Sequence, residues 1–373
     1  GASIFTDQNF TKLFKQSRKN ADARIYLNYE QFFNAVDKYA NSGFNDELTL
    51  LKNFADWTCF DLSLKRKEIK MTGHTTLKPE VQFLSMFKDV NPEKTDIFSV
   101  LPEKTSTIIR FNIGKGEKFK YLYEDYLANV NKLNDYQIKT AEFHNTYKID
   151  SDINNLYNFT ENEIAVIFDD VNKTGKKHNK YVLIRLNDVT GTKSLFQKIA
   201  KIYSDNNSAN LKEFENIKIY NDEIAVNKCP VKNIPELYFG TIFSDFNAEY
   251  YTFIKDFLIF AESSNNIKFF IESYIQDKTF KRKSTSYEFV KSLPSQSNIF
   301  FYTDIFQSLN IYEEILSEKQ AKTLSEDNES FKSIMGPAIQ FISDSYPIYT
   351  TFTVSLEKEE RETSAKRSCF RCN

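Results

Sequence analysis

Glycine is scarce in this chain of 373 residues, with only 9 against 35 Phe and 21 Tyr. So few glycines argue against glycine-rich phosphate loops and against barrels built on tight turns. Charge of one sign is also lacking, since 49 Lys and Arg face 51 Asp and Glu. Such a balance provides none of the attraction that brings basic proteins to nucleic acid or to anionic membranes. We therefore expect no nucleic-acid partner and no role at a membrane surface.

Long apolar runs are absent too. No stretch of about 18 apolar residues occurs, so we expect no transmembrane segment in these 373 residues. The four cysteines are too few for a disulfide framework in a chain of this length. The sequence opens with Gly1 and has no initiator Met, which leads us to expect further chain before it.

The informative feature that is present is a repeated pattern. Four segments read as an apolar strand that ends in Asn or Asp and is followed by a helical pattern. They are residues 24–28, 108–112, 183–187 and 300–304. Asn28 with Gln31, and Asp304 with Gln307, have the spacing of a helix N-cap, which assigns the terminal polar residue a structural role.

A longer similarity indicates two related halves. Predicted hairpins at 60–73 and 250–263 are each followed by a predicted helix, a Leu-Pro pair and a further strand. Successive hairpins favour antiparallel pairing, so we predict an α+β fold of strand-helix and hairpin-helix units, with antiparallel sheets packed against helices. The predicted divisions are a lead-in segment (1–19), a first half (20–150), a second half (151–356) and a mobile charged tail (357–373).

Short motifs that could carry chemistry are incomplete. Cys369 and Cys372 form a CxxC in the tail, but no second CxxC and no paired histidines complete a zinc site. Residues 114–116 read Gly-Lys-Gly, which is shorter than a P-loop. We assign no cofactor and no metal.

Catalytic groups are equally scattered. His74, His144 and His178 lie far apart in the sequence, and no Gly-x-Ser-x-Gly elbow accompanies them. Asp169 and Asp170 lack the spacing of a calcium loop. We assign no catalytic residue, although a triad assembled from distant residues would leave a hydrolase as the alternative function.

Aromatic residues of the second half are the candidate contacts for a partner. Rings left exposed where a hairpin packs on its helix would be natural anchors for a protein, peptide or lipid. The predicted contact residues are Tyr250, Tyr251, Phe253, Phe269, Phe270 and Tyr274.

Several stretches resemble a bacterial family of unknown function found in membrane-anchored envelope proteins. Residues 251–263 and 298–304 carry the resemblance in the second half, and residues 57–64 and 70–73 are similar to the version found in Bacteroidetes. The resemblance implies a protein held by an N-terminal anchor and facing the periplasm, and it implies no activity. Together with the absence of a catalytic motif, it favours a non-catalytic binding or scaffolding module of the cell envelope, whose partner is a protein, peptide or lipid.

Overall fold

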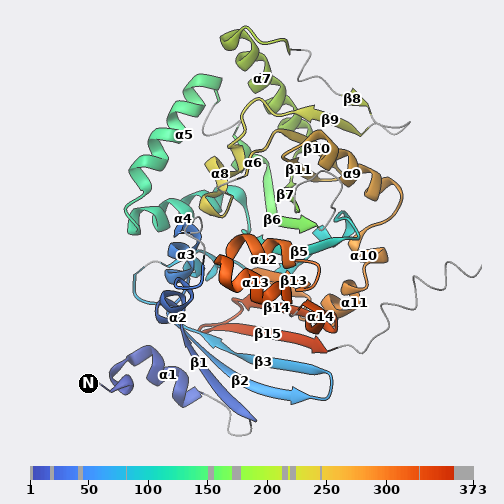
Figure 1. Ribbon diagram of the computed structural model, residues 1–373. Helices are drawn as coiled ribbons and strands as arrows, with labels where there is room; N and C mark the ends of the chain where they lie inside the picture. Colours follow the sequence, from blue (N-terminus) through green and yellow to red (C-terminus); the bar gives the residue numbers. More distant parts are fainter. Residues whose placement is uncertain are drawn as a thin grey trace, which may run out of the picture.

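The computed structural model describes residues 3–16, 21–40, 45–80, 82–149, 155–169, 178–211, 217–218, 224–243, 246–326 and 328–356. Within these residues one sheet of 13 strands runs through the molecule, and neighbouring strands are antiparallel throughout (Figure 1). Its order is β1-β2-β3-β15-β14-β13-β5-β6-β7-β11-β10-β9-β8. The predicted α+β class with antiparallel pairing is confirmed.

The elements repeat as four units, each with one strand, a helical segment and two further strands. Unit 1 is β1 (Ala23–Asn28), α2 (Tyr29–Val36), α3 (Asn45–Lys52), β2 (Trp57–Lys65) and β3 (Glu68–Thr75). Unit 2 is β5 (Thr105–Asn112), α4 (Gly116–Asn129), α5 (Leu133–Tyr147), α6 (Leu156–Phe159), β6 (Thr160–Asp169) and β7 (Asn179–Leu186). Unit 3 is β9 (Ala225–Lys228), α8 (Ile234–Phe239), η6 (Thr241–Phe243), β10 (Tyr250–Ile254) and β11 (Phe257–Ala261). Unit 4 is β13 (Ile299–Thr303), α12 (Leu309–Ile315), α13 (Glu318–Glu326), α14 (Asn328–Phe331), β14 (Ile334–Ile342) and β15 (Ile348–Leu356).

The units meet through equivalent strands. The last strands of units 1 and 4 pair (β3 with β15), the first strands of units 4 and 2 pair (β13 with β5), and the last strands of units 2 and 3 pair (β7 with β11). Unit 4 therefore lies between units 1 and 2 in the sheet. The predicted boundary at residues 150 and 151 falls between α5 and α6, inside unit 2, and strands from both predicted halves contribute to the same sheet.

The four predicted strand-to-helix segments are each a strand followed by a helix, as the sequence indicated. Asn28 accepts the amide of Gln31 at 3.0 Å and Asp304 accepts that of Gln307 at 3.1 Å, so both act as the predicted caps. The four segments do not hold equivalent places, however. β1, β5 and β13 open a unit, whereas β7 closes unit 2 and leads into α7 (Val189–Asn207).

Helices cover both faces of the central strands and create two hydrophobic cores. Alternate residues of one strand enter different cores: Ile184 packs with α4, α5, α7 and α8, and Leu183 packs on the opposite face. That opposite face is covered by η4 (Ile97–Ser99), α9 (Ser264–Ile275), α10 (Phe280–Lys283) and α11 (Ser286–Lys291). Because both faces are dry, these strands read as continuous apolar runs, without the alternation of a half-exposed sheet.

A buried ion pair lies at the centre of the sheet. Arg110 of β5 is fully buried, and its Nε donates to the carboxylate of Glu163 on β6 at 2.9 Å. Its other nitrogens donate to the carbonyls of Ser297 and Lys94, in the two short strands β12 (Gln296–Ser297) and β4 (Glu93–Lys94) that pair with each other. Burial raises the pKa of the Glu163 carboxyl, and the Arg110 guanidinium opposes that rise. The ion pair thus ties the two segments that contain β4 and β12 to the centre of the sheet.

The opposite situation holds at the end of the sheet formed by β1, β2 and β3, which we call the β1 end. Most residues of β1 and β3 are exposed or half-buried. On one face, α1 (Gln8–Gln16) packs its Phe10 against Trp57, whose Nε1 donates to Asp7 at 2.9 Å. Among the other short elements, η1 (Ile4–Thr6) precedes α1, η3 (Phe83–Phe87) follows β3, and β8 (Ile217–Lys218) pairs with β9.

A chain of buried hydroxyl groups joins the β1 end to the rest of the sheet. Tyr29 at the start of α2 bonds Thr58 of β2 at 3.0 Å, Thr58 bonds Thr75 of β3 at 2.6 Å, and Thr75 bonds Thr350 of β15 at 2.6 Å. All four side chains are buried. Each hydroxyl therefore has a partner away from water, as buried polar groups require.

Candidate functional site

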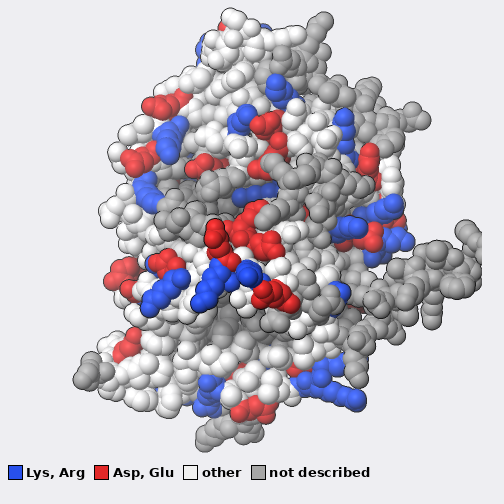
Figure 2. Space-filling model, viewed as in Figure 1, with Lys and Arg blue, Asp and Glu red and all other residues white. Residues whose placement is uncertain are grey.

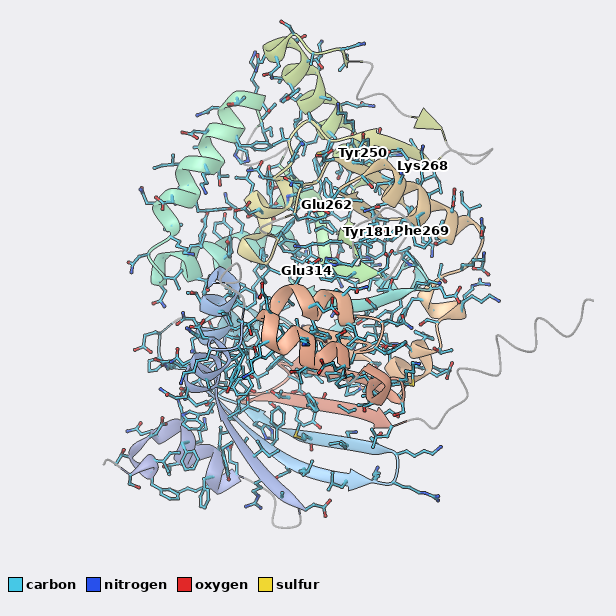
Figure 3. The ribbon with its side chains drawn as sticks, viewed as in Figure 1. Tyr181, Tyr250, Glu262, Lys268, Phe269 and Glu314 are labelled. Atoms are coloured by element: carbon cyan, nitrogen blue, oxygen red, sulfur yellow. The ribbon has the colours of Figure 1, made fainter. Side chains whose placement is uncertain are left out.

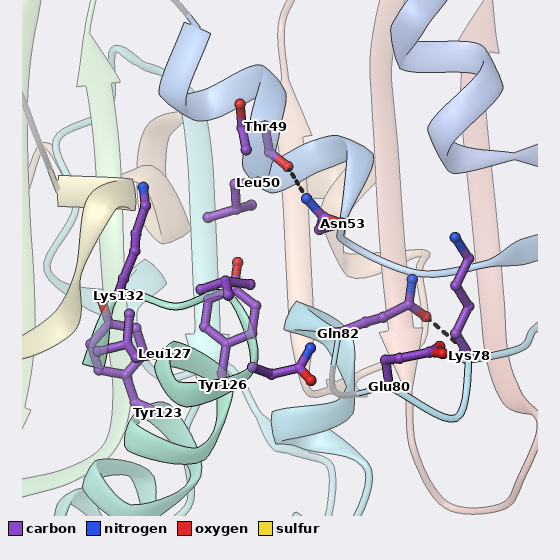
Figure 4. Close-up of a pocket in the computed structure, with 12 residues that line it drawn as sticks. Thr49, Leu50, Asn53, Lys78, Glu80, Gln82, Tyr123, Tyr126, Leu127 and Lys132 are labelled. Carbon is purple, nitrogen blue, oxygen red and sulfur yellow. Dashed lines mark hydrogen bonds between the residues drawn. The ribbon is translucent and has the colours of Figure 1, made fainter. Parts of the chain in front are cut away.

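A cleft of about 490 Å³ lies where unit 1 meets unit 2, between α3 and α4 (Figure 4). The segment after β3 contributes its third wall. Its lining combines two kinds of residue. The apolar and aromatic ones are Leu50, Tyr123, Tyr126, Leu127 and Val130, and the polar and charged ones are Thr49, Asn53, Lys78, Glu80, Gln82, Asn129 and Lys132. The volume lies within the range of ligand sites, roughly 300 to 1,000 Å³.

The α3 wall is held to the segment after β3 by main-chain hydrogen bonds. The amide of Phe83 donates to Asn53 at 3.1 Å, and that of Leu84 donates to Phe54 at 2.9 Å. The rings of Phe54 and Phe83 stack at 5.9 Å between centroids. Two walls of the cleft therefore form one fixed body, so a ligand would not have to order them.

The α4 wall presents tyrosine rings. Tyr123 and Tyr126 are three residues apart and share a helix face, and each is less than a tenth exposed. Tyr126 meets Phe83 edge-on at 5.7 Å, which fixes α4 against η3. Gly240, at φ +89°, leaves room for the Tyr123 hydroxyl, because a Cβ there would lie 2.0 Å from its oxygen. Burial raises the pKa of both tyrosines, so both phenols are neutral hydrogen-bonding groups near pH 7.

Amide side chains also line the cleft. Asn53 donates from Nδ2 to the carbonyl of Thr49 at 3.0 Å, and the main-chain amide of Lys78 donates to Gln82 Oε1 at 2.8 Å (Figure 4). Lys78 Nζ turns to Glu30 at 3.0 Å. The cleft thus combines aromatic rings with amide groups, which can both donate and accept hydrogen bonds. That combination recognises peptide groups beside apolar side chains.

None of these lining residues was predicted from the sequence to belong to a site. One available signal was the run of tyrosines at 121, 123 and 126 within the helical pattern of residues 117–130. Spacing of three residues places Tyr123 and Tyr126 together. The tertiary structure brings α3 and the segment after β3 to face these tyrosines. No local pattern indicates this, because both walls lie more than 40 residues earlier in the chain.

The six predicted contact residues do not form one surface. Tyr251 is 5% exposed and Phe270 is fully buried, and they belong to different cores. The other four are half-buried. Phe253 packs on the core of α7, whereas Tyr250 and Tyr274 pack on the core of α9, where Figure 3 also shows Phe269.

The three histidines lie on different elements. His144 of α5 bonds the Tyr238 hydroxyl at 3.1 Å, and burial lowers its pKa. His178, just before β7, lies 3.7 Å from Glu314 of α12. His74 of β3 packs edge-on against the ring of Tyr349 at 5.8 Å. Each therefore has its own local surroundings.

His74 lies close to a cysteine. It lies opposite Cys59 in the register of β2 and β3, and both line a cavity of about 50 Å³ together with Asp61. Cys59 is only 5% exposed, and burial raises the pKa of its thiol. A nucleophilic cysteine needs a lowered pKa, so the geometry gives this cysteine the character of a packed core residue.

The remaining sequence motifs have structural surroundings. Gly116 begins α4, and a Cβ there would lie 2.2 Å from the carbonyl oxygen of Tyr157, so close packing requires glycine. Asp169 is buried and accepts from Asn179 at 2.7 Å, whereas Asp170, Cys369 and Cys372 lie outside the described residues. In the part of the chain that the structure describes, no group of three His, Cys, Asp or Glu side chains could hold a metal ion.

Surface charges are mixed. In Figure 2 acidic and basic side chains lie next to one another over α12 and α13, where Lys322 and Glu326 approach to 3.9 Å.

Among the described helices, none has both the length and the apolar character needed to cross a bilayer.

Comparisons with protein-family models, with curated proteins and with solved structures each found no match for this chain. The resemblance to the bacterial envelope family therefore stays a prediction.

Proposed function

We propose that this protein is a binding module that takes a peptide segment of a partner protein into the cleft between α3 and α4. The observation that carries the proposal is the lining of that cleft, where buried tyrosine rings lie beside the amide side chains of Asn53, Gln82 and Asn129. An extended peptide offers the complement: apolar side chains for the rings, and main-chain N–H and C=O groups for the amides of Asn53, Gln82 and Asn129.

A peptide suits this cleft better than a lipid chain does. Nine of the twelve lining residues carry a polar or charged group, the hydroxyls of Tyr123 and Tyr126 included, and an acyl chain would leave those groups desolvated without partners. Lys78, Glu80 and Lys132 place both signs of charge at the cleft, so the ligand we infer is a peptide without a strong net charge.

The setting we propose is the cell envelope, facing the periplasm. This part of the proposal rests on the resemblance of residues 251–263 and 298–304 to envelope proteins of unknown function. The role that follows is non-catalytic: a module that holds a partner protein, or joins it to others.

The cleft is tested by blocking it with a large side chain. Asn129 at the end of α4 lines the cleft, whereas its exposed neighbour Ala128 does not. Asn129→Trp should therefore obstruct the ligand, and Ala128→Trp is the matched control on the same turn. The probe is a library of random heptapeptides displayed on phage and selected on the immobilised chain, with enriched peptides then synthesised with a fluorescein label.

Fluorescence anisotropy should show peptide binding that Asn129→Trp weakens by about 30-fold or more, the loss typical of a binding hot spot. Ala128→Trp should bind as the parent does. Equal binding by Asn129→Trp, or no enrichment of any peptide, would refute the cleft as a peptide site. Hydrolysis of an activated ester that is lost in His74→Ala would refute the non-catalytic role and favour the hydrolase alternative.

A further inference from the structure

The outer edge of β1 is an end of the 13-stranded sheet, and among the described residues β2 is the one strand paired with β1. Strand edges pair readily with other chains unless a proline, a bulge or a charge prevents it. β1 contains no proline, and its six residues pair with β2 in unbroken register. Its single charge, Arg24, contacts Asp61 of β2 at 3.2 Å. β1 therefore has neither a proline nor a break in its register to prevent pairing, and its one charge is already paired within the chain.

Exposed apolar side chains gather around this edge. Phe14 of α1 is 44% exposed, Ile25 of β1 is 42% exposed and Phe32 of α2 is 45% exposed. Such a concentration is typical of a surface that is covered by another protein.

The fold itself contains a pairing of the kind that would cover this edge. β5 and β13 open units 2 and 4 as β1 opens unit 1, and they pair antiparallel with Ile109 opposite Phe301. In the repeated sequence pattern, residues 24–28, 108–112 and 300–304 correspond, so Ile25 holds the place of Ile109 and of Phe301. The pair joins equivalent positions, which means that units 2 and 4 meet about a local two-fold axis at this point.

The hydrogen-bonding parity of β1 matches that of β5. Tyr29 donates its amide to Asp56 at 3.1 Å, and because bonding groups alternate along a strand, the amide of Ile25 also points toward β2. Ile113 donates to Asn162 beside β6 at 2.8 Å, so Ile109 likewise points toward β6. Ile109 and Phe301 therefore form a non-hydrogen-bonded pair, and Ile25 would form one with a strand added at the outer edge.

We propose that β1 pairs antiparallel with β1 of a second copy of this chain, with Ile25 opposite Ile25 of the partner subunit. The geometry is that of the β5 and β13 pair, repeated between two molecules about a two-fold axis. In this register Arg24 lies opposite Tyr26 of the partner subunit. A shift of one residue on each strand would instead place the two Arg24 side chains opposite each other, and like charges in that position repel. The sheet continues from one subunit into the other, and Phe32 of each subunit flanks the new pair.

Self-association is tested first by mass. Sedimentation velocity of the full chain between 1 and 100 µM should show a dimer in equilibrium with monomer. A small edge interface should have a dissociation constant of about that order. Ile25→Lys should weaken the dimer by about 30-fold or more, because a lysine at a strand edge opposes pairing. Tyr121→Lys is the matched control, since Tyr121 is 66% exposed on α4, away from the β1 end. Circular dichroism of both variants checks that each is folded.

The register is tested by a disulfide. Cα atoms of a non-hydrogen-bonded pair lie about 4.5 Å apart, within disulfide reach. In a Cys369→Ser, Cys372→Ser background, Ile25→Cys should therefore give a covalent dimer on mild oxidation. Leu64→Cys, which is 58% exposed on β2, should not.

Three outcomes would overturn the proposal. They are a monomer at 100 µM, a dimer that Ile25→Lys leaves intact, and a covalent dimer of Leu64→Cys in place of Ile25→Cys. A monomer whose selected peptides are lost on Ile25→Lys would show that the edge receives a different chain, which also overturns self-pairing.

Discussion

The centre of the sheet and its β1 end have similar sequence patterns in very different surroundings. Ile184 of β7 and Ile25 of β1 hold the same position in the repeated segment, yet Ile184 is fully buried and Ile25 is 42% exposed. Helices cover both faces at the centre, whereas much of the β1 end is left half-open. The local sequence thus determines that a strand forms at both places. The elements packed against the strand determine how much of it is buried, and therefore how much burial stabilises it.

The largest difference should come from the two arginines that share a place in the repeat. Arg110→Ala removes the charge partner of the buried Glu163 carboxyl, which should lower the free energy of unfolding by about 3 to 5 kcal/mol. Arg185 occupies the same position in β7 but is 24% exposed, between Asp96 and Asp256. Its replacement by Ala should cost about 1 kcal/mol or less, because solvent screens such pairs.

Urea unfolding at pH 7 measures both arginine variants. Arg110→Met is a useful third variant, since it retains the packing of the side chain but still strands Glu163. Equal losses for Arg110→Ala and Arg185→Ala would contradict the contrast between a dry centre and a solvated margin.

The next difference concerns the two isoleucines. Ile184→Ala should lower the free energy of unfolding by about 2 to 5 kcal/mol, the usual cost of truncating a core isoleucine. Ile25→Ala should change it by less than about 0.5 kcal/mol, as surface substitutions do. Chemical unfolding at a protein concentration of 1 µM or below keeps self-association from adding to the second value. A large loss in Ile25→Ala under these conditions would show that the β1 end is covered within one chain.

The smallest difference between parent and variant that depends on burial should arise from the hydroxyl chain that ties the β1 end to β15, and it should depend on pH. Tyr29→Phe removes one hydrogen bond, which should cost about 0.5 to 1.5 kcal/mol at pH 8. Burial raises the pKa of Tyr29 to about 12. An unfolded tyrosine has a pKa of about 10, so between these values the unfolded chain releases a proton that the folded chain keeps. Tyr29 therefore makes the parent lose stability as the pH rises from 10 to 12.

The gap in stability between the parent and Tyr29→Phe should narrow over that range of pH. Urea unfolding at pH 8, 10 and 11 measures it, with Tyr121→Phe as the exposed control. A gap that is constant with pH would mean that Tyr29 titrates alike in the folded and unfolded chain, and that its hydroxyl is solvated.

Much of the local structure could be read from the sequence, because it depends on residues close together in the chain. Asn28 and Asp304 cap as predicted, since the amides they accept lie three residues away. The hairpins at 60–73 and 250–263 and the strands at the four repeated segments are present for the same reason. The candidate site could not be read in this way, because Tyr126 and Asn53 belong to different units and lie far apart in the sequence.

By itself the sequence determined the α+β class, the antiparallel pairing and the strand-to-helix step, because periodicity and caps act over a few residues. The tertiary structure alone decided that the units join into one sheet through equivalent strands, with unit 4 between units 1 and 2. It also decided which copies of the repeat are buried. Arg110 and Arg185 have the same local sequence pattern, but Arg110 donates to carbonyls of the short strands β12 and β4, whereas Arg185 pairs with partly exposed carboxylates. Burial is a property of neighbours that are distant in sequence, and no local pattern specifies them.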